Sequence, residues 1–279
     1  MLGAKRSSER LCGILPVVEG VSHIPGRPLK HHADPIPVFD LDVAPYLPVQ
    51  ALQARLRVAV AEGRAPGVLL LLEHEPVITL GSRAGAQDLR DGGYDMGSGQ
   101  APPAKAAAPL IPSLAGGIPV AESERGGQAT LHAPGQLISY PIVRIPGHDL
   151  SAFVRGLEEA NIMLLAEFGI AAERRAGRPG LYVAGDKISS VGLRCQRWVS
   201  SHGTSLNVSV DLSLFGAIVS CGEPQLHQTS IERLVPAPPP MSAVKQAYIR
   251  AVKQVFGWEF LSLRPVLHDR VEAELGLEG

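Results

Sequence analysis

Two polar groups in the second half of the chain could form a nucleophilic pair. Cys221 is followed at once by a glycine, and Lys187 begins a polar cluster that includes Ser189 and Ser190. An ammonium group near a thiol favours the thiolate, which is the reactive form of cysteine. Taken singly, Cys221 reads as a small buried hydrophobe and Lys187 as a solvated surface residue. The two together are what a cysteine acyl-transfer enzyme would need.

The segment 185–207 is expected to position the lysine. Apolar residues such as Ile188 and Leu206 flank a polar stretch at 197–201, which predicts two strands joined by a turn. A lysine held between a tight turn and a buried strand lies close to whatever packs across the sheet. We expect that neighbour to be Cys221.

A third polar segment, residues 125–136, contains adjacent glycines whose backbone N–H groups could approach a ligand closely. His132 within it and the later His202 can equally be core histidines bonded to backbone groups. The chain has no GxxxxGK[ST] phosphate loop, no GxGxxG after a strand, no HExxH and no GxSxG. These absences argue against nucleotide, zinc-protease and serine-hydrolase chemistry.

Composition sets wider limits. The 279 residues are 45% hydrophobic, and 26 basic residues nearly balance 27 acidic ones, so no global field favours nucleic acid or an anionic membrane. The longest apolar run is of strand length, far below the roughly 20 residues of a membrane span. Three cysteines, of which Cys195 reads as structural and Cys12 as incidental, suit a reducing compartment and predict a cytoplasmic protein.

The pattern of elements predicts a mixed α/β (α+β) domain at residues 37–263, after a loose N-terminal extension at 1–36 and before a C-terminal tail at 264–279. Residues 91–117 lack periodicity and predict an insertion loop. Pro141 indicates an edge or bulged position. Asp149 or Ser151 is expected to cap the helix at 149–168, and Ser242 is expected to cap the last helix. Strands are expected at 38–41, 68–73, 77–80, 118–121, 137–145, 170–174, 180–184 and 258–263, with helices at 49–62, 149–168 and 242–256.

Five motifs occur in a specific order: EHEPV at 73–77, RGGQATLHAPGQL at 125–137, GLYVAGDKISSVGLR at 180–194, SHGTSLNV at 201–208, and the Cys-Gly pair at 221–222. Together they resemble the lipoyl (octanoyl) transferases of lipoate biosynthesis, which have the biotin/lipoate protein ligase fold. The resemblance covers roughly residues 38–262.

The resemblance implies an octanoyl-[acyl-carrier-protein]:protein N-octanoyltransferase that uses no cofactor and no metal. Its partners would be octanoyl-acyl carrier protein and the lipoyl domains of 2-oxoacid dehydrogenase complexes and the glycine cleavage H protein. By position, Cys221 matches the acyl-thioester nucleophile and Lys187 the residue that lowers its pKa. The matching substrate-binding residues are Arg125, Gly126, Gly127, Gln128, Ala129, Thr130, Leu131, His132, Ser190, Val191, Gly192, His202, Gly203 and Thr204.

Further expectations follow from this chemistry. Lys187 could also accept a proton from the acceptor amine, and the amides of the two glycine segments could stabilise an oxyanion. A slot for the C8 chain is expected from Leu131, Leu137, Val191 and Leu193. Five arginines are expected to form a docking patch for an acidic carrier protein: Arg174, Arg175, Arg178, Arg194 and Arg197. The alternative, nearly as well supported, is that they are surface arginines that bind no partner protein.

The chain departs from the family pattern at four positions: Glu124 before the Arg-Gly-Gly, Ala133 after the histidine, Thr204 after the His-Gly, and Ser220 before the cysteine. None removes the cysteine or the lysine. Two alternatives stay open: an ATP-dependent lipoate or octanoate ligase on the same fold, and a non-catalytic homologue that binds acyl groups or carrier proteins.

Overall fold

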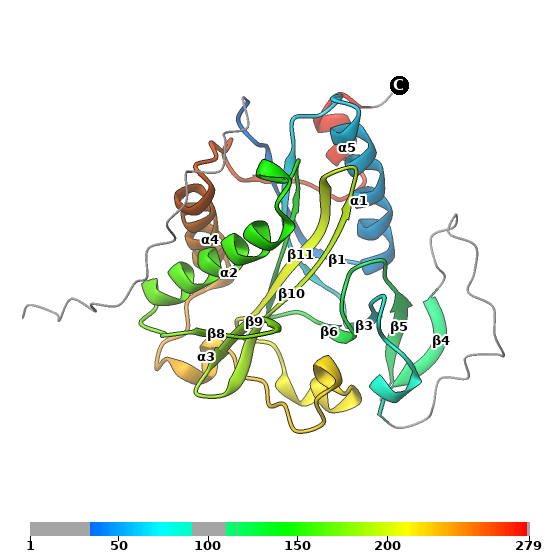
Figure 1. Ribbon diagram of the computed structural model, residues 1–279, viewed down its shortest axis with the longest axis vertical. Helices are drawn as coiled ribbons and strands as arrows, with labels where there is room; N and C mark the ends of the chain where they lie inside the picture. Colours follow the sequence, from blue (N-terminus) through cyan, green and yellow to red (C-terminus); the bar gives the residue numbers. More distant parts are fainter. Residues whose placement is uncertain (1–33, 91–109, 116, 278–279) are drawn as a thin grey trace, which may run out of the picture.

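The computed structural model describes residues 34–90, 110–115 and 117–277, with two β-sheets and helices on both faces of the larger one (Figure 1). In this described part, the larger sheet has eight strands in the order β12-β1-β2-β7-β11-β10-β9-β8. Strands β12, β1 and β2 run parallel and every other neighbouring pair is antiparallel, which confirms the mixed α/β class. The strands are β1 (Val38–Ala44), β2 (Val68–His74), β7 (Gln136–Ile142), β8 (Glu173–Arg175), β9 (Arg178–Val183), β10 (Asp186–Gln196), β11 (Val199–Asn207) and β12 (Arg264–Pro265).

A smaller sheet has the order β4-β5-β3-β6. Its strands are β3 (Val77–Leu80), β4 (Leu110–Ala115), β5 (Ile118–Glu122) and β6 (Ala129–His132). The expected loop at 91–117 therefore ends in a strand that pairs with β5. Its other residues, 91–109 and 116, lie outside the described part of the chain.

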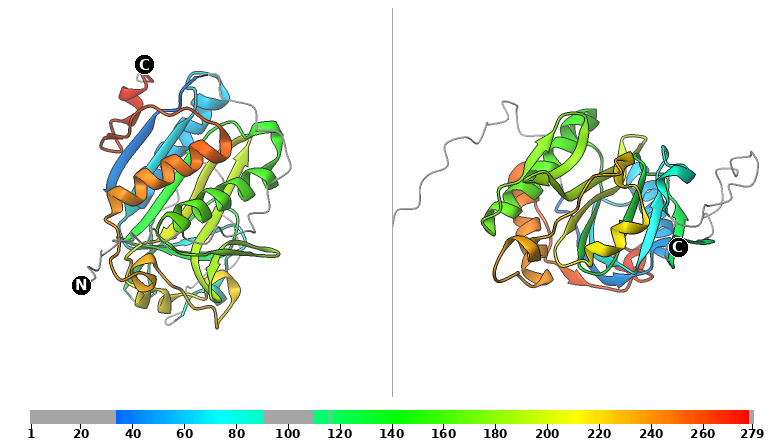
Figure 2. Two further views of the ribbon diagram at one scale, coloured as in Figure 1. Left: turned by 90° about the vertical axis from the view of Figure 1, so that its left-hand side faces the viewer. Right: turned by 90° about the horizontal axis from the view of Figure 1, so that it is seen from below.

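Helices enclose the larger sheet from both sides. α1 (Tyr46–Ala61) covers one face, and α2 (Leu150–Glu167) and α4 (Met241–Phe256) lie side by side on the other (Figure 2). The larger sheet has a hydrophobic core on each face, because successive side chains of β2 point to opposite sides. Leu69 and Leu71 pack toward α2 and α4, whereas Leu70 and Leu72 pack toward α1. No helix in the described residues is long and apolar enough to cross a membrane.

The expected helix starts are half confirmed. Asp149 caps α2, since its Oδ1 accepts a hydrogen bond from the Ala152 N–H at 2.8 Å. Ser242 does not cap α4, because the helix begins at Met241 and Pro240 occupies the N-cap position without a side-chain bond. The short helices are η1 (Ala86–Asp88), η2 (Pro146–His148), η3 (Leu212–Ala217), η4 (Ser220–Gly222), α3 (Ile231–Leu234) and α5 (Val271–Glu274).

The turn between β10 and β11 is tighter than the expected polar stretch at 197–201. Only Arg197 and Trp198 form it, with φ of 52° and 61°, while Ser200 and Ser201 are buried and belong to β11. The hydroxyl of Ser200 is bonded to the backbone of β7, so a polar side chain is satisfied inside a strand. Polarity alone therefore misplaced the start of this strand.

Pro141 lies in a central strand, because β7 is flanked by β2 and β11, so the expected edge position is wrong. A bulge is absent as well, because the β7–β11 register is the same on both sides of Pro141, from Ser139↔Thr204 to the bridge Arg144↔Val199. Continuous β7–β11 pairing ends at Ser139↔Thr204, and the two strands are bonded again where the Ser200 N–H reaches the Val143 carbonyl. Proline is tolerated here because the ladder is interrupted beside it.

The chain ends differ from expectation where the structure describes them. Residues 258–263 form a single bridge, Ile36↔Phe260, and not a strand. The segment expected to be a tail contributes β12 and α5, whose Val271 is fully buried against the α1 face. Residues 1–33 of the expected N-terminal extension lie outside the described part, while Ile36 is part of the core.

Candidate active site

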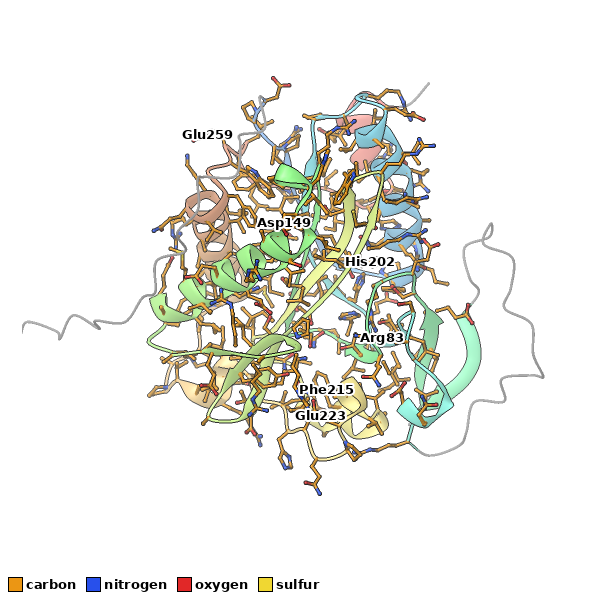
Figure 3. All side chains as sticks on the ribbon, viewed as in Figure 1. Arg83, Asp149, His202, Phe215, Glu223 and Glu259 are labelled. Atoms are coloured by element: carbon orange, nitrogen blue, oxygen red, sulfur yellow. The ribbon has the colours of Figure 1, made fainter. Side chains whose placement is uncertain are left out.

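A cavity of about 610 Å³ opens where the β5–β6 loop, strands β10 and β11, and the first turns of α2 meet. Figure 3 labels three residues that line it from separate segments: Arg83, His202 and Glu223. All but one of the predicted substrate-binding residues line this cavity, as does Lys187. They are Arg125, Gly126, Gly127, Gln128, Ala129, Thr130, His132, Ser190, Val191, Gly192, His202, Gly203 and Thr204. Three motifs separated in sequence therefore converge on one site.

Leu131 is the exception. It is fully buried in a small core formed with Ile78, Val120 and Ile218, on the side of β6 away from the cavity. Leu131 does not line the cavity, and its place in the substrate-binding set stays a prediction. Its neighbours Thr130 and His132, whose side chains point to the other face of β6, do line the cavity.

Lys187 is 2% exposed and is held on several sides. Its Nζ donates to the Pro179 carbonyl at 3.2 Å and lies 5.5 Å from the centroid of the Tyr182 ring. A Cβ on Gly180 would come within 2.9 Å of the lysine Cε, so glycine there leaves room for the side chain. The ammonium is thus fixed in the cavity wall.

The backbone of Lys187 also ties the cavity to the segment that follows the cysteine. Its N–H donates to the His227 carbonyl and its carbonyl accepts from the Thr229 N–H, both at 2.9 Å. Cys221 itself lies in η4, whose Gly222 lines the same cavity as Lys187. The structure describes the backbone of Cys221 and not its side chain.

Helix η4 is anchored by two neighbouring segments. The Val219 N–H donates to the Asp88 carbonyl at 2.8 Å. Gly222 has φ of +70°, and a Cβ there would overlap the side-chain amide of Gln128. The left-handed backbone conformation therefore favours a glycine after the cysteine, and the Gln128 side chain of the β5–β6 loop packs against it.

Arg125 supports the glycine loop from inside. Its guanidinium donates to the Thr79 carbonyl at 2.6 Å and to the Thr79 hydroxyl at 2.9 and 3.1 Å, and the residue is 7% exposed. The Gly126 N–H donates to the Leu193 carbonyl at 2.9 Å, which joins the loop to β10. That amide is already engaged, so the expectation that it stabilises an oxyanion is wrong for Gly126.

The comparisons with known proteins agree with this arrangement. Residues 45–253 match the family model of the lipoyl protein ligase A/B catalytic domain. The chain is 39% identical over 223 residues to an octanoyltransferase of Nitratidesulfovibrio vulgaris, covering 78% of this chain and 94% of that protein. An octanoyltransferase of Chloroflexus aggregans is 38% identical over 234 residues, or 82% and 96% of the two chains. The chain belongs to the octanoyltransferase family.

Solved structures show the same fold at low sequence identity. Lipoate-protein ligase A bound with ATP has a TM-score of 0.61 at 14% identity, covering 88% of this chain and 100% of that one. A putative lipoate protein ligase from T. acidophilum has a TM-score of 0.61 at 16% identity, covering 87% and 92%. The predicted family, fold class and acyltransferase activity are confirmed.

One wall of the octanoyltransferase cavity is aromatic. His132 and His202 in it were predicted from the sequence, whereas Tyr46, Tyr140 and His74 were missed. Tyr46, His132, Tyr140 and His202 line it, and His74 stands behind them. The rings contact one another. Tyr46 and His132 are stacked with their ring centroids 6.3 Å apart, and Tyr140 lies edge-on to His202 with a centroid distance of 6.0 Å. The histidines of the EHEPV and SHGT motifs were a signal, but nothing in their spacing predicts that they meet.

These histidines are neutral at pH 7. Burial lowers the pKa of His74 to about 4 and that of His202 to about 3, and it holds the pKa of His132 well below its usual value. Burial also raises the pKa of Tyr140 well above 10. These rings are therefore uncharged, and the cation nearest to them is the buried guanidinium of Arg125, which also lines the cavity.

Hydrogen bonds determine which ring nitrogen carries the proton in two of these imidazoles. Nδ1 of His74 lies 2.8 Å from the Ala44 carbonyl, which only accepts, so Nδ1 carries the proton and Nε2 accepts from the Tyr140 hydroxyl at 3.0 Å. His132 Nδ1 lies 3.3 Å from Gln136 Oε1. The Gln136 amide in turn donates to Asn207 Oδ1 at 2.9 Å, which orients its oxygen toward the histidine.

The expected acyl slot is half correct. Val191 and Leu193 line the cavity, whereas Leu131 and Leu137 are buried in separate cores. Leu150 and Val154, from the start of α2, take their place in the lining. Residues of a helix that begins far along the chain could not be assigned to the slot from local spacing.

The expected basic patch is largely neutralised. Arg174 pairs with Glu158 at 3.1 Å and Glu159 at 2.6 Å, and Arg178 pairs with Glu223. Arg194 is paired with Glu124. Arg175 stacks over the Tyr182 ring at 4.2 Å. Acidic residues distant in sequence supply these partners, so the local excess of arginine overstated the positive charge.

Proposed function

We propose that the protein transfers an octanoyl group from the thioester of an acyl carrier protein to a lysine of a lipoyl domain, through a thioester on Cys221. The acceptors would be the lipoyl domains of 2-oxoacid dehydrogenase complexes and the glycine cleavage H protein. One observation carries the proposal: the buried ammonium of Lys187 lines the same cavity as the η4 backbone next to Cys221.

In the resting pair the proton of Cys221 is already on Lys187, and in the first half-reaction the thiolate beside this ammonium attacks the octanoyl carbonyl carbon. The carbon–sulfur bond to the carrier's thiol breaks as the new thioester forms, and the departing thiolate takes the proton back from Lys187. One thioester replaces another, so this step is close to balanced in free energy.

In the second half-reaction, the neutral amine of the acceptor lysine attacks the thioester on Cys221. Its nitrogen loses a proton to Lys187 while the carbon–sulfur bond breaks, which leaves an amide, a thiolate and an ammonium. The same lysine thus activates the nucleophile and removes the proton from the acceptor. After transfer, the pair is ready for another carrier thioester.

The lining of the cavity supports an acyl substrate. Val191 and Leu193 provide apolar surface, and the uncharged rings of His132, Tyr140 and His202 lie on the other side. A hydrocarbon chain placed there loses contact with water and does not desolvate an ion.

Intact-mass measurement after mixing with octanoyl carrier protein tests the proposal. The wild-type chain should gain one octanoyl group, and Cys221→Ala should gain none. Adding a lipoyl domain should then discharge the adduct without ATP. Absence of an adduct on the wild-type chain, together with ATP-dependent octanoylation of the acceptor, would instead support the ligase alternative.

A further inference from the structure

We infer that Gln53, on α1, is a positioning residue that holds His202 in the cavity wall. The inference rests on the proposed function, in which the segment His202–Thr204 binds the acyl donor. Gln53 does not line the cavity and belongs to none of the motifs that identify the family. Its role follows from the backbone of β11 at the point where that strand reaches the cavity.

The backbone of His202 has an unusual conformation. Its φ is +57°, in the left-handed region that side-chain-bearing residues rarely adopt. The residue lies at the interruption of the β7–β11 ladder, beside the Ser139↔Thr204 pair that ends it. Because Pro141 in β7 has no N–H, that strand offers fewer bonds at this point.

Gly203 allows the two strands to approach despite the interruption. A Cβ at this position would overlap the Ser139 carbonyl oxygen and lie 2.8 Å from Cδ of Pro141. The glycine therefore lets β11 pass close to β7, and the chain turns at His202. Without a further contact, the backbone N–H of His202 would be a buried donor with no ladder partner on β7.

Gln53 supplies that contact. The His202 N–H donates to Gln53 Oε1 at 2.7 Å, and the glutamine is 1% exposed. The acceptor comes from the helix that covers the opposite side of the sheet from α2 and α4. The bond fixes the left-handed backbone, and the imidazole is then held edge-on to Tyr140 in the cavity wall.

Three variants test this role. Gln53→Leu removes the acceptor with little change of volume, whereas Gln53→Glu keeps an oxygen at the same place. Gln50→Leu is the matched control, because Gln50 lies one turn earlier on α1 and its side chain bonds to Glu122 on β5 instead of β11. The assays are steady-state octanoyl transfer at several donor concentrations, melting temperature, and octanoyl adduct formation by intact mass.

We expect Gln53→Leu to lower kcat/KM for the octanoyl donor by roughly tenfold, the effect of losing one hydrogen bond that orients a binding residue. Gln53→Glu should recover most of this loss, and Gln50→Leu should stay within about twofold of wild type. Gln53→Leu and Gln50→Leu should have similar melting temperatures. Both should lie above the temperature of the assay, so that the folded enzyme is compared.

Equal kcat/KM values for Gln53→Leu and Gln50→Leu, with a wild-type chain that forms the octanoyl adduct, would overturn this inference alone. A wild-type chain that forms no adduct would instead overturn the proposed function. If Gln53→Leu does not fold, amide hydrogen exchange on the wild-type chain decides the matter. The His202 amide should be protected like its β11 neighbours, and rapid exchange in the folded protein would contradict the inference.

Discussion

The two sides of the cavity are built in different ways. On one side, Lys187 and the Gly222 backbone of η4 line the cavity together, and the ion pair Arg178–Glu223 lies next to them. On the other side, Tyr140, His132 and His202 are buried and uncharged. Under the proposed function, this contrast predicts a division of work, in which one wall supplies charge to the reacting sulfur and the other accepts a hydrocarbon chain.

Removing the nucleophile from the charged wall should have the largest effect. Cys221→Ala is expected to lower the rate of octanoyl transfer by on the order of 10³-fold or more, because no other group can carry the acyl chain. Transfer to a purified lipoyl domain, followed by mass spectrometry, measures the loss. Cys195→Ala is the control and should transfer at close to the wild-type rate. Retained transfer in Cys221→Ala would mean that the acyl group passes directly to the acceptor.

Removing the charge should have the next largest effect. Lys187→Met is expected to lower kcat by roughly 10²-fold, within the range for loss of an acid–base group. Lys253→Met, the same change at an exposed lysine that pairs with Glu259, should leave kcat unchanged. Single-turnover rates for each half-reaction should both fall in Lys187→Met. A fall in only the first half-reaction would contradict the second role given to this lysine.

The neutral wall should respond to acid. Since the pKa of His74 is about 4 and that of His202 about 3 in the folded chain, the unfolded chain binds more protons between these values and about 6.5. Unfolding free energy should therefore decrease as pH falls through that window, by about 1.4 kcal/mol per pH unit for each histidine. Urea titrations from pH 7 to pH 5 measure the slope, and His74→Gln should make it shallower. An unchanged slope would show that His74 is protonated in the folded state.

The smallest effects should separate lining residues from core residues. Leu131→Ala is expected to lower the unfolding free energy by about 2–5 kcal/mol while leaving KM for the octanoyl donor nearly unchanged. Val191→Ala should do the reverse, with a small loss of stability and a change in the preferred acyl chain length. Melting curves and transfer assays with C6, C8 and C10 donors measure both. A rise in KM for folded Leu131→Ala would restore that residue to the binding site.

Much of the charged wall could be predicted from the sequence, because its residues lie in contiguous motifs. The Arg125–Thr130 loop and the strand after Lys187 each carry a local pattern of glycine and polar residues, and both line the cavity. The cap of α2 at Asp149 was predictable for the same reason, since a cap depends on a few neighbouring residues.

The neutral wall could not be predicted in the same way. Its rings come from α1, β2, β6, β7 and β11, and only the fold brings them together. The bond from His202 to Gln53 joins residues 149 positions apart. Likewise, the glutamates that neutralise Arg174 and Arg194 lie outside the segment that suggested a basic patch. Interactions that depend on tertiary contact leave little trace in local spacing.

The central claim is that Lys187 ionises Cys221. The pH dependence of alkylation by iodoacetamide, followed at each cysteine by peptide mapping, tests it most directly. Cys195 is an internal reference, since burial raises the pKa of its thiol. In the wild-type chain, Cys221 should react rapidly near neutral pH and Cys195 slowly, and Lys187→Met should shift the Cys221 profile to higher pH. A Cys221 profile that is identical in the wild-type and Lys187→Met chains would contradict the claim.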